Sequence, residues 1–207
     1  MIPLGVLAGR RASGEVTIRS VQEGLTVDIP AGAPGALLVV TGGGDTPVTD
    51  VTLAGDDASL LDLRTSGSAE TSRQVSMWWG PEPTPDTGVE ITTSTIVRQH
   101  VATIMLDGVR LDTPMRDSQS FSSTGSGAPP DLTPPVSNGG LVIFGFCARS
   151  GVLFGPAYEY QETLVSQNDN NSVGRSTLIT ASAHGPVSYS PSSAAIRAGL
   201  ALSLSPA

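Results

Sequence analysis

The stretch Gln74–Val109 decides the fold class. It reads QVSMWWG (74–80), PEPTPDTG (81–88), VEITTS (89–94) and TIVRQHVATIMLDGV (95–109). Two runs of strand-forming residues flank a loop rich in proline, a residue that cannot donate to a β-ladder. The run Ile96–Leu106 then carries apolar side chains on both of its sides, which is typical of a central strand buried on both faces. We therefore predict three strands of an all-β domain here.

The composition of the whole chain agrees with this prediction. Of its 207 residues, 39% are hydrophobic and 14% are charged, and 24 glycines and 16 prolines are available for turns. The mean hydropathy of +0.08 is too high for a disordered chain. Helical periodicity is nowhere sustained except weakly over residues 194–204, where Gly199 argues against a helix. We expect an all-β fold, an antiparallel two-sheet β-sandwich.

Charge and apolar runs exclude several classes of function. The formal net charge is −8, so we expect no nucleic-acid binding, which needs a basic surface. No apolar run reaches the length of a membrane span, so we expect no membrane insertion. The N-terminal apolar stretch is too short for a signal peptide and precedes its charges, which predicts synthesis in the cytoplasm without a cleaved signal.

Further strands are predicted from apolar runs and alternation. They cover residues 14–19, 25–29, 36–41, 48–53, 59–64, 141–147, 161–166, 174–182 and 194–204. We expect 14–19 and 25–29 to pair through the turn at Glu23-Gly24, and Gly55-Asp56-Asp57 to form a hairpin turn. Residues 106–117 are predicted to be a turn at Asp107-Gly108 and an irregular crossing. Residues 121–136 are predicted to be a long surface loop, in preference to a linker between domains.

Three aromatic residues are candidates for ligand binding. Trp78 and Trp79 are adjacent on a predicted strand and must face opposite ways, so one enters the core while the other is free to meet solvent or a partner. An exposed indole, or the ring of Tyr160, is able to stack on a sugar. The alternative is that neighbouring loops cover both indoles.

Oxygen ligands of the kind that Ca²⁺ prefers occur in several predicted turns. The candidates are Asp45, Asp56, Asp57 and Asp169, the last within an Asn-rich cluster. Their spacing matches no established calcium loop, and Asp and Asn are also ordinary turn residues. We expect no cofactor, with Ca²⁺ as the alternative.

A catalytic arrangement is not supported by any motif. His100 and His184 are the two histidines, and no G-x-S-x-G sequence accompanies them. The single cysteine, Cys147, lies in an apolar run and is predicted to be a core residue. We therefore predict that the protein is not an enzyme. The competing hypothesis, a hydrolase, requires a pocket in which one of the histidines meets a carboxylate.

The order of these phrases resembles a family of Gly/Ser/Thr-rich jelly-roll sandwiches found in bacteriophage virion proteins. The phrases are ALLVV, VTDVTLAG, SMWWG, PEPTPDTG, VEITTS, VATIMLDGV, TPMRD and PPVSNGGLVIFG, followed by a terminal strand that ends in Leu-Ser-Pro. The resemblance covers residues 36–207, which it marks as a jelly-roll, lectin-like domain. Residues 1–35 are then an N-terminal arm with edge strands.

The resemblance implies a function as well as a fold. We expect a non-enzymatic virion structural protein, either a capsid-surface decoration or fibre or a tail component, made in the host cytoplasm. Its partners would be other virion proteins and copies of itself, in a homo-oligomer. The alternative is a lectin-like module that binds a host surface glycan or receptor.

Overall fold

The protein is described by a computed structural model. It describes residues 14–43, 47–66, 72–94, 99–124, 131–149, 161–169, 175–182 and 197–207. All regular structure in these residues is β-strand, and all the strand pairs are antiparallel. The prediction of an all-β antiparallel fold is confirmed. Within the same ranges, no helix has the length and apolar character needed to cross a bilayer.

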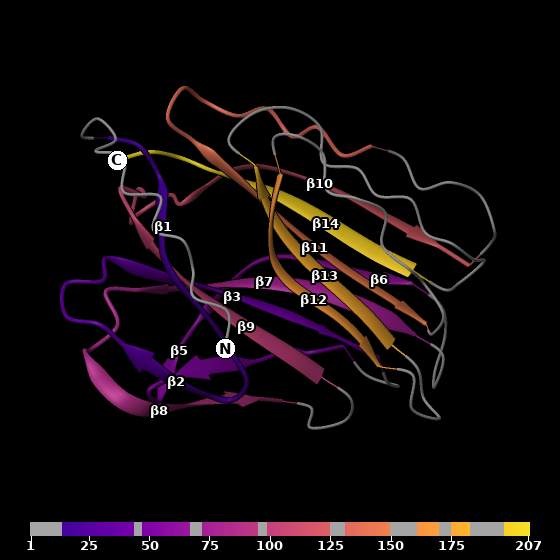
Figure 1. The fold of residues 1–207 in the computed structure, drawn as a ribbon, viewed down its shortest axis with the longest axis horizontal. Coiled ribbons are helices and arrows are strands. Elements are labelled where there is room, and N and C mark those ends of the chain that lie inside the picture. Colours follow the sequence, from indigo (N-terminus) through magenta and orange to yellow (C-terminus); the bar gives the residue numbers. More distant parts are fainter. Residues whose placement is uncertain are drawn as a thin grey trace.

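The strands form three sheets (Figure 1). The first sheet has the order β1-β9-β3-β7-β6, with bounds Thr17–Glu23, Gln99–Asp107, Gly35–Gly42, Arg73–Pro81 and Ser59–Ser66. The second has the order β10-β14-β11-β13-β12, with bounds Met115–Ser123, Arg197–Leu204, Leu141–Arg149, Arg175–Ser182 and Gln161–Asp169. The third has the order β2-β8-β4-β5, with bounds Thr26–Ile29, Asp86–Thr93, Val51–Leu53 and Asp56–Asp57.

The first sheet is the middle layer of three. On its strand β3, Leu37 and Val39 belong to the apolar core shared with the second sheet, while Leu38 and Val40 belong to the core shared with the third. Strand side chains alternate between faces, so a strand buried in this way is mainly apolar along its length, on both faces. The prediction of two sheets therefore misses one layer. The continuous apolar run ALLVVT is explained by burial on both faces.

The first and second sheets are stacked so closely that glycine is required between them. A Cβ built on Gly145 of β11 would lie 2.7 Å from Val75 Cγ1 and 3.1 Å from Val39 Cγ1. Both valines belong to strands of the first sheet. Cys147 on the same strand is fully buried, which confirms its prediction as a core residue.

Two of the predicted pairings are wrong. β1 and β2 do not pair with each other: β1 pairs with β9 and β2 with β8, so the chain crosses from the first sheet to the third at Gly24. Both strands are sheet edges and lie within the predicted N-terminal segment 1–35. Asp56 and Asp57 are not the turn but the short strand β5, which pairs with β4 through the turn at Ala54-Gly55.

Strand β10 was not predicted. Residues 115–117 were expected to belong to an irregular crossing and residues 121–123 to a surface loop, yet Met115–Ser123 form an edge of the second sheet. Phe121 is the one buried side chain of this strand. The others are partly or fully exposed, and most of them are polar. A strand without an apolar face has no period-2 signal in the sequence.

The turn between β4 and β5 offers a test of backbone strain. Ala54 and Gly55 both have positive φ, 58° and 84°, as a two-residue type I′ hairpin loop requires. Ala54 is exposed, so its side chain contributes little packing. We expect Ala54→Asn to raise the free energy of unfolding by about 1 kcal/mol, because asparagine tolerates the left-handed region better than alanine.

Urea unfolding measures this effect. Ala31→Asn is the matched control, because Ala31 is also exposed but does not have a positive φ. It is expected to leave the unfolding midpoint unchanged. An equal effect of the two substitutions would contradict the assignment of strain to Ala54.

Candidate functional site

The two tryptophans are both buried, on opposite faces of β7. Trp78 lies in the core between the first and third sheets, and Trp79 in the core between the first and second. Each is 3% exposed. The Nε1–H of Trp78 donates to Ser76 Oγ at 2.8 Å. Neither indole offers an open face, so stacking on a sugar would require neighbouring side chains to move.

The remaining predicted ligand residues are not brought together. Tyr160 and Asp45 lie outside the described residues, and so does His184. Asp56 and Asp57 are exposed on the short strand β5. Asp169 ends β12, where its backbone lies opposite Arg175 of β13. The described residues contain no group of three or more His, Cys, Asp or Glu side chains that could hold a metal ion.

His100 is paired with a carboxylate. Its Nε2 lies 2.9 Å from Glu23 Oε2, and the imidazole is 7% exposed. An ionised carboxylate only accepts hydrogen bonds, so in a hydrogen bond with it Nε2 is the donor. Nδ1 is buried and has no hydrogen-bond partner among the described residues. No nucleophile is thus hydrogen-bonded to this imidazole in that part of the chain.

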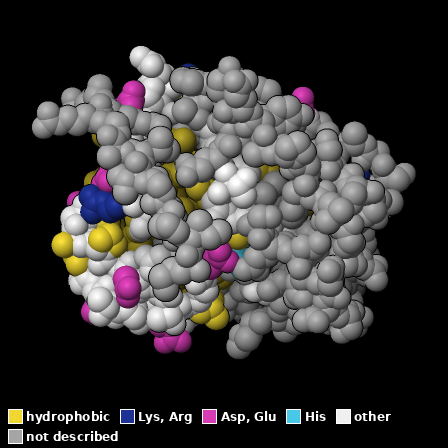
Figure 2. Space-filling view, in the orientation of Figure 1, with side chains coloured by type: hydrophobic (Ala, Val, Ile, Leu, Met, Phe, Trp, Pro, Cys, Tyr) yellow, Lys and Arg dark blue, Asp and Glu magenta, His cyan; other side chains and the backbone are white. Residues whose placement is uncertain are grey.

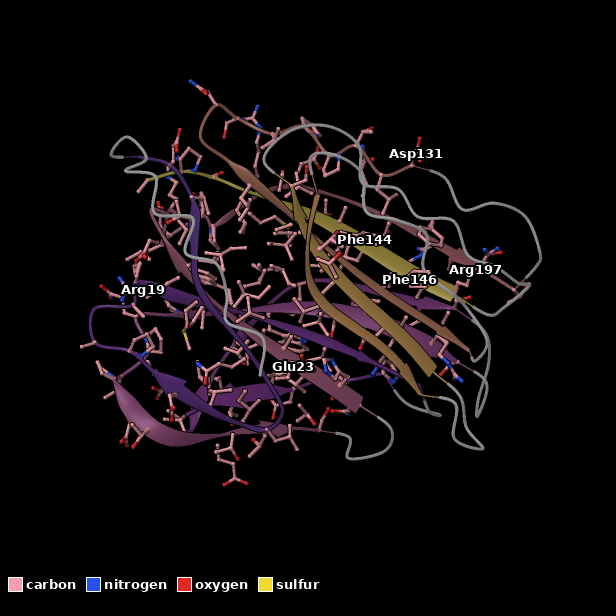
Figure 3. The ribbon with its side chains drawn as sticks, viewed as in Figure 1. Arg19, Glu23, Asp131, Phe144, Phe146 and Arg197 are labelled. Carbon is pink, nitrogen blue, oxygen red and sulfur yellow. The ribbon has the colours of Figure 1, made fainter. Side chains whose placement is uncertain are left out.

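The position of this pair gives it a structural role. Glu23 is the last residue of β1, next to the glycine at which the chain leaves the first sheet (Figure 3). The N–H of Gly24 donates to the carbonyl of Val101 at 2.9 Å, and the N–H of Ile91 donates to the carbonyl of Leu25 at 2.8 Å. Together these bonds fasten the crossing from the first sheet to the third. A His–carboxylate pair was required by the hydrolase hypothesis, but here it fastens a strand crossing.

A second polar group connects the first and second sheets. Thr41 Oγ1 of β3 and Thr177 Oγ1 of β13 are 2.9 Å apart and buried. The thiol of Cys147 donates to the carbonyl of Gly42 at 3.4 Å. Buried polar groups that are satisfied in this way set the register of the two layers. These side chains are occupied in holding sheets together.

The outer face of the second sheet carries an aromatic cluster. Phe144 and Phe146 of β11 have ring centroids 6.4 Å apart, and Phe121 of β10 lies at the same distance from Phe146 (Figure 3). Leu132 packs against this cluster. The side-chain amide of Gln119 holds the chain beside Leu132, accepting from the N–H of Thr133 at 2.7 Å and donating to its carbonyl at 3.1 Å. The cluster is buried in the structure.

The third sheet and its connections form an acidic layer. The described residues 24–43, 47–58 and 80–94 contain no Arg or Lys, and all seven of their carboxylates are exposed. These are Asp28, Asp50, Asp56, Asp57, Glu82, Asp86 and Glu90. In Figure 2, carboxylates are spread over the region where β2 and β8 lie. Sequence reasoning missed this layer, although no basic residue occurs between Arg19 and Arg64 or between Arg73 and Arg98.

The charge of the acidic layer accounts for most of the net charge of the described part. Its described residues contain seven carboxylates and no Arg or Lys, while the other described residues have nine carboxylates and eight arginines. Like charges at this density repel one another, and they also repel a second acidic layer. Contact between two copies through this face is therefore unfavourable at low ionic strength.

Comparisons with protein-family models, with curated proteins and with solved structures give no match for this chain.

Proposed function

We propose that this protein is a non-enzymatic structural component of a bacteriophage particle, on the capsid surface or in the tail. The order of phrases from Ala36 onward resembles such proteins. We also propose that the first and second sheets constitute the jelly-roll-like sandwich of that family, with the third sheet added as an outer layer. The partners would be other virion proteins and further copies of this chain.

The observation that carries this proposal is the double burial of the middle sheet. Strands β3, β7 and β9 are covered on both faces by apolar side chains of the other two sheets. A layer enclosed in this way has little freedom to bend or open, because close-packed interiors resist deformation. Such a body transmits load between neighbours, which is the task of a particle component.

The use of the polar interior side chains supports the same conclusion. His100, Thr41 and Cys147 have the chemistry of catalytic groups, yet each is bonded to a neighbouring strand at a crossing or a layer contact. The described structure thus employs its reactive groups to fasten strands. A mechanical role accounts for all three arrangements at once.

Quantitative mass spectrometry of gradient-purified particles tests the proposal. We expect this chain to band with the particles at a constant ratio to the main shell protein after a high-salt wash. Hundreds of copies would indicate a capsid-surface component, and three to a dozen a tail component. Recovery only in the soluble fraction at the top of the gradient would refute the proposal.

A glycan array, with and without Ca²⁺, distinguishes the proposed structural role from the alternative, a module that binds a host surface glycan or receptor. We expect no binding by the isolated protein, because both indoles are buried. Specific binding that is lost in a variant of Tyr160 or of Asp169 would favour the receptor-binding function instead.

A further inference from the structure

The outer strands of the two five-stranded sheets share one irregularity. In each of β1, β6, β10 and β12, the register with the neighbouring strand shifts by one residue. In β10, for example, Met115 pairs with Leu204 and Asp117 with Ser203, so Arg116 is extra. The four extra residues are Arg19, Leu61, Arg116 and Leu164. Each edge therefore contains a β-bulge.

The inner ladders of these sheets show no such shift. The pairs β3–β7, β3–β9, β11–β13 and β11–β14 each keep one register along their length. Among the described residues of these two sheets, the irregularity is thus confined to the edge strands. The third sheet has one register shift, between β2 and β8, and its extra residue lies on the inner strand β8. All four edges of the two five-stranded sheets contain a bulge, which indicates a physical reason specific to the edges of these sheets.

The edges of the third sheet are closed by other means. The side-chain amide of Gln22 donates to the carbonyl of Asp28 at 2.7 Å and accepts from its N–H at 2.8 Å. These are the groups by which another strand would add to β2. At the other edge, β5 has two residues.

The side chains of three of the four extra residues make contacts with the rest of the protein. The guanidinium of Arg19 binds Asp107 of β9, with Nε 3.0 Å from Oδ2, and reaches the carbonyl of Ala31 at 3.0 Å (Figure 3). Leu61 and Leu164 pack against the core between the first and second sheets. Arg116 is exposed and lies outside these cores, and its deletion would leave a regular β10–β14 ladder.

We propose that the bulges keep a second copy of this chain from adding to the sheet edges, and that β10 is a latent interface which a single deletion opens. A regular edge presents a row of unpaired N–H and C=O groups to any neighbouring strand. A bulge disrupts the spacing of that row and twists the strand away. Copies packed together then meet through faces and loops. This inference goes beyond the proposed function and does not depend on it.

Deletion of Arg116 tests the inference directly. Sedimentation velocity of the whole chain over a range of concentrations is the measurement. We expect the deletion to raise the self-association constant by about tenfold or more. Arg116→Ala is the matched control: it removes the charge, retains the bulge and is expected to sediment like the unaltered protein. A folded deletion variant that sediments like Arg116→Ala overturns the inference.

A deletion at a second edge strand, β6, tests the inference if the Arg116 deletion variant does not fold. Deletion of Leu61 makes β6 regular, because Leu60 already pairs with Trp78 and Asp62 with Met77. Its control is Leu61→Ala, which loses the same packing but keeps the bulge. We expect increased association in the deletion alone. If both deletions abolish the cooperative unfolding transition, the bulges are needed for folding and the inference is overturned.

Discussion

Replacing Gly108 with alanine is expected to lower the free energy of unfolding by about 3 kcal/mol or more. Gly108 has a φ of 66°, and an added Cβ would overlap the backbone carbonyl of Glu15. A backbone atom cannot rotate aside as a side chain does. The carbonyl of Gly108 also accepts from the N–H of Ala207 at 2.8 Å. Residues near both ends of the described chain, Glu15 and Ala207, therefore lie against Gly108.

Gly88→Ala separates steric overlap from backbone strain. Gly88 has the same φ of 66°, but nothing lies within 4 Å of the position that a Cβ would take. We expect a loss of about 1–2 kcal/mol for this control. Thermal unfolding followed by circular dichroism compares the two variants. Equal losses would show that the contact with Glu15 does not exist in solution.

Replacing Trp79 with alanine is expected to cost about 3–5 kcal/mol of stability. The indole fills the core between the first and second sheets and lies against Gly35, where an added Cβ would overlap its ring. The loss comes from the large apolar volume removed. Denaturant unfolding measures it, with exposed Leu60→Ala as the control, for which we expect a change below about 0.5 kcal/mol.

Phenylalanine substitutions at the two tryptophans refine this prediction. Trp78 Nε1 donates to Ser76 Oγ, whereas Trp79 Nε1 is buried without a hydrogen-bond partner among the described residues. Trp79→Phe removes an unsatisfied donor and should therefore cost less than Trp78→Phe. If either tryptophan served a ligand instead of the core, its replacement would leave stability unchanged and abolish glycan binding.

Much of the strand content was predictable, because buried strands leave a pattern in the chain. The run 141–147 and the alternation at 25–29 correspond to β11 and β2, which extend or trim the predicted limits by a few residues. Strand β10 left no pattern, since its side chains are mainly polar. The prediction of Trp78 and Trp79 on opposite faces was also sound, because strand geometry dictates it.

The candidate site was much less predictable. His100 meets Glu23 across 77 positions of sequence, and Thr41 meets Thr177 across 136. No local pattern encodes contacts of this range. The acidic layer was partly predictable. The absence of basic residues is visible in the sequence, but the carboxylates gather in one layer only because β2, β8, β4 and β5 pair in one sheet.

By itself, the sequence determined that this protein is built of antiparallel strands with a dry interior, because alternation and apolar runs are local properties of the chain. The tertiary structure decided that there are three layers, that both indoles are covered and that each edge of the two five-stranded sheets has a bulge. An apolar run reports only that a strand is buried. Which sheet covers each face is settled by long-range packing, where many weak contacts act together.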